Sequence, residues 1–119
     1  MAFEEYSAKV MDHFLNPRHT GEVVAPTHSA LAENPVCGDM MKLTLRVEAG
    51  MIREAKAKTF GCAAAIACSS AVTEMLMGRT IAEARAITDD AVVTWLGGLP
   101  DHKVKCSLVA EQVLREALK

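Results

Sequence analysis

Two stretches in which apolar and polar residues alternate, 41–48 and 51–60, lie on either side of the dipeptide Ala49-Gly50. Alternation with a period of two is typical of a strand that has one face buried and the other in water. Because only two residues separate the stretches, we expect them to pair as an antiparallel hairpin. One face of this hairpin is apolar, so the rest of the chain must cover it.

Helical patterns lie on both sides of the hairpin. Before it, apolar residues recur at steps of three and four until Asn16-Pro17, which is a typical helix stop. After it, residues 63–77 are rich in alanine and charged only at Glu74, which predicts a helix buried on most of its surface. Ser7 is the expected cap of the first helix, and three further helices are expected to follow capping residues at Thr80, Thr88 and Ser107.

The order of helix, strands and helices predicts an α+β fold, in which a small antiparallel sheet is packed on one face by helices. A length of 119 residues is enough for one core, so we expect a single domain over residues 1–119. Residues 18–36 show little periodicity, and we expect a long loop there with one short strand near Val23-Val24.

Charge and hydropathy exclude several classes of function. The 13 basic and 15 acidic side chains give a net charge of -2, which provides no electrostatic grip on a nucleic acid. No segment approaches the roughly 20 apolar residues of a membrane helix, and the N-terminus lacks the apolar run of a signal peptide. We therefore expect a cytoplasmic protein that binds neither nucleic acid nor membrane and whose cysteines stay reduced.

Three of the four cysteines, Cys37, Cys62 and Cys106, lie at predicted element boundaries. The unpaired N–H groups of a helix start favour a thiolate, and boundaries of packed elements can converge. Asp39 would add a carboxylate, so that three thiolates and one carboxylate complete a zinc site or hold a small iron–sulfur cluster. Separations of 25 and 44 residues, without a C-x-x-C pair, leave open that the cysteines are small buried residues. This second interpretation is favoured for Cys68, in the middle of a helix.

The residues near the third boundary cysteine allow two interpretations each. Lys105 is either a solvated side chain or a cation that lowers the pKa of the Cys106 thiol. His102 is either solvated or a further metal ligand. His13, on the first predicted helix, is expected to pack or to form a hydrogen bond rather than to bind a metal.

Several short motifs, spread over nearly the whole chain, match one known family. They are residues 6–10, 12–14, 16–18, 37–39, 58–67, 96–100 and 105–107. In these motifs the chain resembles the U-type iron–sulfur cluster assembly scaffolds, namely IscU and the N-terminal domain of NifU.

The resemblance implies a scaffold that takes sulfur from a cysteine desulfurase and iron from an iron donor. It would assemble a transient [2Fe–2S] cluster and pass it to apo iron–sulfur recipient proteins. The implied ligands of the cluster are Cys37, Cys62 and Cys106 together with Asp39, and Zn2+ is the implied alternative occupant of the same site. Cys106 and Cys37 are then the candidate acceptors of persulfide sulfur, with Lys105 tuning the thiolate.

Two positions depart from the pattern of this family. Scaffolds usually have histidine where this chain has Lys105, and lysine there resembles the SufU branch, whose members are zinc-dependent sulfur acceptors. A zinc-dependent sulfurtransferase is therefore the alternative to a non-enzymatic scaffold, and a domain with a structural zinc is a third interpretation. The 44-residue gap before Cys106 has no room for the insertion of the SufU branch.

The second departure concerns a chaperone. Residues 99–103 read LPDHK instead of LPPVK, which argues against an Hsp70-type chaperone as a partner.

Overall fold

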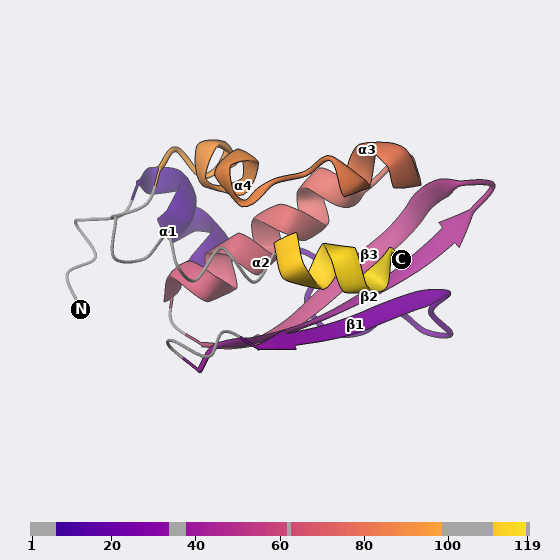
Figure 1. Cartoon of the computed structure of the whole chain (residues 1–119). Helices are drawn as coiled ribbons and strands as arrows, with labels where there is room; N and C mark the ends of the chain where they lie inside the picture. Colours follow the sequence, from indigo (N-terminus) through magenta and orange to yellow (C-terminus); the bar gives the residue numbers. More distant parts are fainter. Residues whose placement is uncertain (1–6, 34–37, 62, 99–110, 119) are drawn as a thin grey trace.

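A computed structural model describes residues 7–33, 38–61, 63–98 and 111–118. Its named elements are α1 (Ala8–Leu15), β1 (His28–Glu33), β2 (Met40–Glu48), β3 (Met51–Phe60), α2 (Ala63–Leu76), α3 (Ile81–Arg85) and α4 (Asp89–Trp95). A further helical segment covers residues 111–117. The strands form one antiparallel sheet in the order β1-β2-β3, and the helices lie on one of its faces (Figure 1), so the predicted α+β fold is confirmed.

The predicted hairpin is formed by β2 and β3. Ala49 and Gly50 make a two-residue turn in which both φ angles are positive, 53° and 76°. This backbone conformation matches the right-handed twist of the two strands, although it is costly for alanine. A single register shift occurs between Arg46 and Val47, and the pairing is otherwise continuous to the open end of the hairpin.

The prediction of a short strand near Val23-Val24 was wrong. The strand in this region is β1, which forms the edge of the sheet and pairs with β2. Val23 is buried but belongs to no strand, since its N–H donates to the side chain of Thr44, at 2.9 Å from Oγ1, and not to a neighbouring strand. Val24 is exposed. β-branched residues favour strands only where a neighbouring strand offers its backbone groups, and here a side chain takes that place.

The segment before β1, residues 19–27, crosses the face of the sheet that carries no helix. It begins beside β3, where Gly21 N donates to Ala57 O at 3.1 Å and Ala57 N donates to His19 O at 3.0 Å. It ends beside β2, where Thr27 N donates to Leu45 O at 2.9 Å. This crossing segment therefore adds one short pairing at the β3 edge and covers the middle of the outer face.

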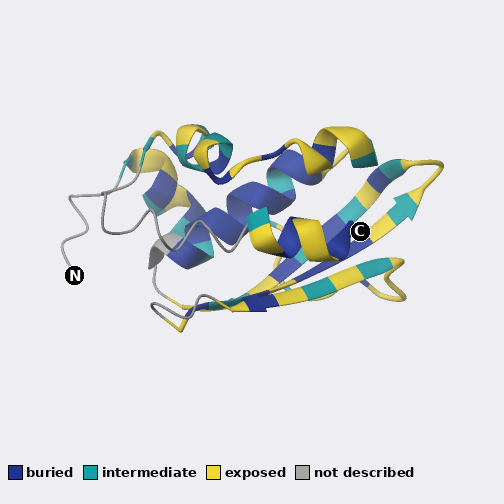
Figure 2. Cartoon of the chain, viewed as in Figure 1, coloured by how far each residue is buried: buried dark blue, intermediate teal, exposed yellow. Residues whose placement is uncertain are grey.

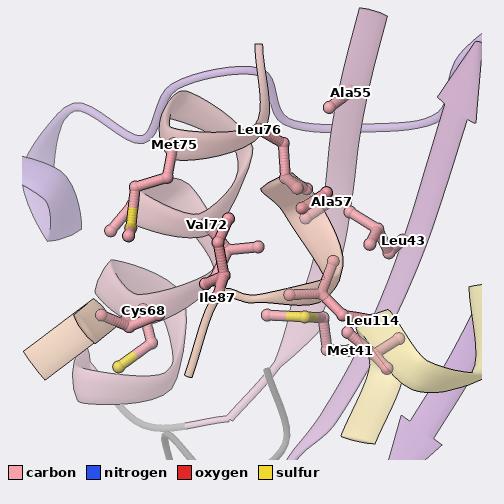
Figure 3. Close-up of a cluster of buried hydrophobic side chains, with 14 of the residues drawn as sticks. Met41, Leu43, Ala55, Ala57, Cys68, Val72, Met75, Leu76, Ile87 and Leu114 are labelled. Carbon is pink, nitrogen blue, oxygen red and sulfur yellow. The ribbon is translucent and has the colours of Figure 1, made fainter. Parts of the chain in front are cut away.

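The core lies between the inner face of the sheet and α2. α2 is buried along nearly its whole described length (Figure 2), as its alanine-rich composition predicted. Met41 and Leu43 of β2 gather with Val72 and Leu76 of α2 in one cluster (Figure 3). Cys68 is 1% exposed within the same core, which agrees with its prediction as a small buried residue.

The predicted helix caps within the described segments are confirmed. Ser7 accepts a hydrogen bond from Val10 N at 3.1 Å, Thr88 accepts one from Ala91 N at 3.1 Å, and Thr80 forms a capping box with Glu83. The cap predicted at Ser107 lies outside the described residues. None of the helices found in the described segments is long and apolar enough to cross a membrane.

Asp89 and Glu111 connect the starts of α4 and of the helical segment 111–117. Glu111 N donates to Asp89 Oδ1 at 3.0 Å, and Asp89 N donates to Glu111 Oε2 at 3.1 Å. Asp89 is 6% exposed. Burial raises the pKa of Asp89 to about 6; the backbone hydrogen bond from Glu111 opposes this rise, and the Glu111 carboxylate adds to it.

We predict that Asp89→Asn stabilises the protein at neutral pH. A carboxyl group whose pKa rises from 3.8 to about 6 on folding contributes stability that is present below pH 3.8 and is lost as the pH rises through about 6. Asparagine keeps the oxygen that accepts from Glu111 but carries no charge. The gain at pH 7.5 should reach at most about 3 kcal/mol and shrink toward acid pH.

Urea unfolding between pH 4.5 and 7.5 measures this dependence. Asp90→Asn, which removes a charge from an exposed position of the same helical turn, is the matched control. A difference between Asp89→Asn and the natural protein that stays constant over this pH range would contradict the prediction.

Candidate functional site

The open end of the β2–β3 hairpin places Asp39 against Gly61. Met40 lies opposite Phe60 in the ladder, so the next residues outward become neighbours. A Cβ atom on Gly61 would lie 2.6 Å from Asp39 Cγ and 2.7 Å from Asp39 Oδ1, closer than real Cβ atoms approach other atoms. The φ angle of Gly61 is not in the positive range, so glycine is needed here for space rather than for its backbone freedom.

The carboxylate of Asp39 is withdrawn from solvent. Asp39 is 7% exposed, although the adjacent Gly38 and the facing Gly61 are both exposed. In the alternation of β2, Asp39 falls on the same face as the buried Met41, which is the face that α2 covers. A carboxylate in such a place is costly unless hydrogen bonds, a cation or a metal stabilise it. The open end of the hairpin thus holds a carboxyl group that is shielded from solvent.

Of the residues that the sequence assigned to the site, the structure describes Asp39. Cys37, Cys62, Cys106 and Lys105 lie outside the described residues, as does His102. Within the described part of the chain no three His, Cys, Asp or Glu side chains come together in a group that could hold a metal ion. The predicted thiolate site therefore remains a prediction, with its carboxylate component placed at the hairpin end.

His13 lies in a buried polar contact between α1 and α2. Its Nδ1 is 2.8 Å from Ser70 Oγ, and Ser70 Oγ also accepts a hydrogen bond from Arg18 N at 2.8 Å. Burial lowers the pKa of His13, and the positive charge of Arg18 lowers it further, which favours the neutral form of the ring. The prediction that His13 packs and forms a hydrogen bond is confirmed.

Sequence reasoning missed the partners of this contact. Ser70 joins two elements, and Thr73, one helical turn further along α2, donates to Arg18 O at 3.3 Å. The available signal was a run of hydroxyl side chains inside a helix that was otherwise apolar and predicted to be buried. Buried hydroxyl groups require partners, and here the chain after α1 provides them.

Ser7 ties the start of α1 to the end of α4. Besides capping α1, its hydroxyl group donates to Leu96 O, and a Cβ on Gly97 would meet Ser7 Cβ at 3.4 Å. The positive φ angles of Gly97 and Gly98, 79° and 101°, then end α4. This contact fixes the point at which the chain leaves α4 toward the stretch of sequence that contains Cys106.

The fold and the hairpin end define a class: a small α+β domain with a buried carboxylate between two stretches of sequence that carry cysteines. The sequence model of the family described as the NifU-like N terminal domain matches residues 5–119, and the chain belongs to this family.

Curated relatives cover nearly all of this chain. It is 50% identical over 113 residues to the iron-sulfur cluster assembly scaffold protein IscU 1 of Archaeoglobus fulgidus, a match that covers 95% of this chain and 74% of that protein. It is 45% identical over 117 residues to the IscU scaffold protein of Buchnera aphidicola, which covers 95% of this chain and 91% of the relative.

Solved structures agree with the fold. A protein from Fervidobacterium islandicum, described as a putative iron-sulfur cluster assembly scaffold for the SUF system, matches with a TM-score of 0.80 and 22% identity, covering 100% of both chains. A nitrogen-fixing NifU-like protein (N-terminal) from Brucella abortus matches with a TM-score of 0.66 and 22% identity over 95% of this chain and 80% of that chain. At these identities the structural matches support the fold alone.

We predict that Gly61→Ala destabilises the protein through the Asp39 side chain. The added methyl group cannot fit beside the carboxylate, and overpacking of this kind costs about 1–3 kcal/mol. In the Asp39→Ala background the carboxyl group is gone, so the cost of Gly61→Ala should fall by at least half. A double-mutant cycle measured by urea unfolding tests this coupling, and additive effects would show that Asp39 and Gly61 do not meet.

Proposed function

We propose that this chain is a scaffold on which a [2Fe–2S] cluster is built and from which it is passed to apo iron–sulfur recipient proteins. The observation that most supports this proposal is the buried carboxylate of Asp39 against Gly61 at the open end of the hairpin. Cys37 precedes Asp39 by two residues and Cys62 directly follows Gly61 in the sequence. The curated relatives that carry the name of iron-sulfur cluster assembly scaffold add to this support.

The proposed ligands are three thiolates, from Cys37, Cys62 and Cys106, and the carboxylate of Asp39. Thiolates are the usual ligands of iron–sulfur clusters, and four ligands suffice for two irons bridged by two sulfides. A carboxylate is a harder ligand than a thiolate, so the bond to Asp39 is the one that makes release easier. The same donor set is suited to Zn2+, which we propose as an alternative occupant.

We propose that sulfur arrives from a cysteine desulfurase as a persulfide. The thiolate of Cys106 or Cys37 attacks the outer sulfur of the desulfurase persulfide, the S–S bond breaks, and the desulfurase cysteine leaves as a thiolate. The positive charge of Lys105, next to Cys106 in the sequence, favours the attacking thiolate. Ferrous iron from a donor and an external thiol reductant supply the electrons that reduce the transferred sulfur to sulfide.

We propose that the desulfurase docks on an apolar surface made by Leu31, Met40 and Phe60. Leu31 and Phe60 are 58% and 65% exposed, which is unusual for large apolar side chains. Met40 pairs with Phe60 directly, and Leu31 lies diagonal to Met40, so the three share the outer face of the sheet. This surface lies at the same end of the hairpin as Asp39, where a partner must deliver its persulfide.

Anaerobic reconstitution with ferrous iron, cysteine, a desulfurase and a thiol reductant tests the scaffold function. We expect absorption bands of thiolate-to-iron charge transfer and about two irons and two sulfides per cluster. Cys106→Ser should abolish the bands, whereas Cys68→Ala, at a buried position outside the site, should retain them in the folded protein. A colourless protein that accumulates persulfide and binds one zinc would replace the scaffold with the zinc-dependent sulfurtransferase, which Lys105 favours.

We predict that Phe60→Ser weakens binding of the desulfurase at least tenfold without loss of stability. The side chain is exposed, so its removal costs the folded protein little, while an interface loses an aromatic anchor. Val24→Ser, at another exposed apolar position on the crossing segment, is the control and should leave the affinity unchanged. Calorimetric titration of each variant with the desulfurase gives the affinities, and equal affinities would rule out this docking surface.

A further inference from the structure

β1 forms one edge of the sheet and has a hydrogen-bonded neighbour, β2, on one side only. In Figure 1 it runs along the side of the molecule opposite α3 and α4. Among the described residues, no backbone hydrogen bond reaches β1 from outside the β1–β2 ladder. An edge strand directs part of its N–H and C=O groups away from the sheet, so these groups of β1 are open to a further strand.

The opposite edge of the sheet, β3, is engaged at two places. Ala57 forms two backbone hydrogen bonds with the crossing segment. Ile52 N donates to Arg79 O at 2.8 Å, and Gly78 N donates to Ile52 O at 2.9 Å. The described part of the chain thus covers the β3 edge at both ends and leaves the β1 edge open.

The sequence of β1 lacks the features that usually protect an edge strand. Such strands are blunted by lysine, by proline, by a bulge or by being very short. β1 has six residues, HSALAE, with neither lysine nor proline, and it pairs with β2 without a register shift. Leu31 near its centre is 58% exposed, and its carboxylate, Glu33, stands at the end of the strand. An edge of this kind favours pairing with another strand.

β1 is complementary to a second copy of itself. Two antiparallel copies are related by a two-fold axis perpendicular to the sheet, and opposed residues must share a face, so each register is centred on one residue. With Leu31 at the centre, the two Leu31 side chains meet and Ser29 of each copy lies opposite Glu33 of the other. In this arrangement no like charges stand opposite each other, and a hydroxyl group faces each carboxylate.

The neighbouring register, centred on Ala30, is less favourable. It pairs as many residues, but it sets each Leu31 opposite Ser29 and moves Glu33 beyond the end of the facing strand. The two exposed leucines then do not cover each other. Cross-strand pairs of apolar side chains stabilise a sheet, so the register centred on Leu31 is preferred.

We propose that the edge of β1 is a homodimer interface, at which a second copy of this chain adds its own β1 and the two sheets become one of six strands. The apolar surfaces made by Leu31, Met40 and Phe60 in the two copies then lie on the same face of one sheet. Two short strands bury less than the roughly 1,000 Å² of a stable interface, so the dimer is weak, with a dissociation constant of about 0.1 mM. The pairing needs neither a metal nor a desulfurase and therefore does not rest on the proposed function.

Sedimentation equilibrium of the isolated protein, from about 10 µM to about 1 mM, tests the proposal. A chelator and a thiol reductant exclude copies that are joined by metal or by disulfides. We expect a monomer–dimer equilibrium that Leu31→Lys weakens at least tenfold, because two positive charges then face each other. Val24→Lys, the same change of charge at an exposed position outside the strand, is the matched control and should leave the equilibrium unchanged.

Cross-linking tests the register. In Leu31→Cys the two introduced thiols face each other with Cα atoms roughly 4.5–5.5 Å apart, which a disulfide can span. In Ser29→Cys they are roughly 13 Å apart, so mild oxidation should link the copies through position 31 and not through position 29. Mass spectrometry of the peptides identifies which thiols are joined. The proposal is overturned if the protein stays monomeric at the highest concentration, if Leu31→Lys dimerises as strongly as the natural protein, or if both positions cross-link equally.

Discussion

The register of the β2–β3 ladder decides what stands at the open end of the hairpin. Ala49 and Gly50 close the other end as a two-residue turn, and the pairing then runs outward until Met40 meets Phe60. A slip of one residue would reverse the faces of every side chain on one strand. It would also separate Asp39 from Gly61, whose contact has no room for even one additional carbon atom. A turn more than eight residues away along each strand thus sets the position of a buried carboxylate.

α2 links this hairpin to the rest of the molecule. Its apolar side chains close the core over the sheet, while its hydroxyl side chains hold the chain that follows α1. Ser70 binds both His13 and the backbone of Arg18, so it holds the end of α1 and the chain that leads into the crossing segment. Packing and polar contacts on this one helix therefore hold both the hairpin and the chain after α1 in place.

Much of this arrangement was predictable from sequence patterns, because strict alternation, capping residues and an alanine-rich helix each leave a local signal. β1 leaves none: its sequence HSALAE lacks β-branched and aromatic residues, and it forms a strand because β2 offers an edge to pair with. The importance of Asp39 could be predicted from its place after Cys37. Its contact with Gly61 could not, because that contact depends on the register of two strands.

The described core accounts for the stability of the fold without a metal ion. The buried residues of the core are almost all aliphatic. Among the described residues, the core contains one cysteine, Cys68. A domain held together by zinc would need its ligands to complete the fold, as small metal-dependent domains do. Here burial of some twenty apolar side chains between sheet and helices provides that stability without any thiolate. If the proposed scaffold function holds, the sheet, and with it the Asp39–Gly61 contact, stays in place while a cluster is gained and lost.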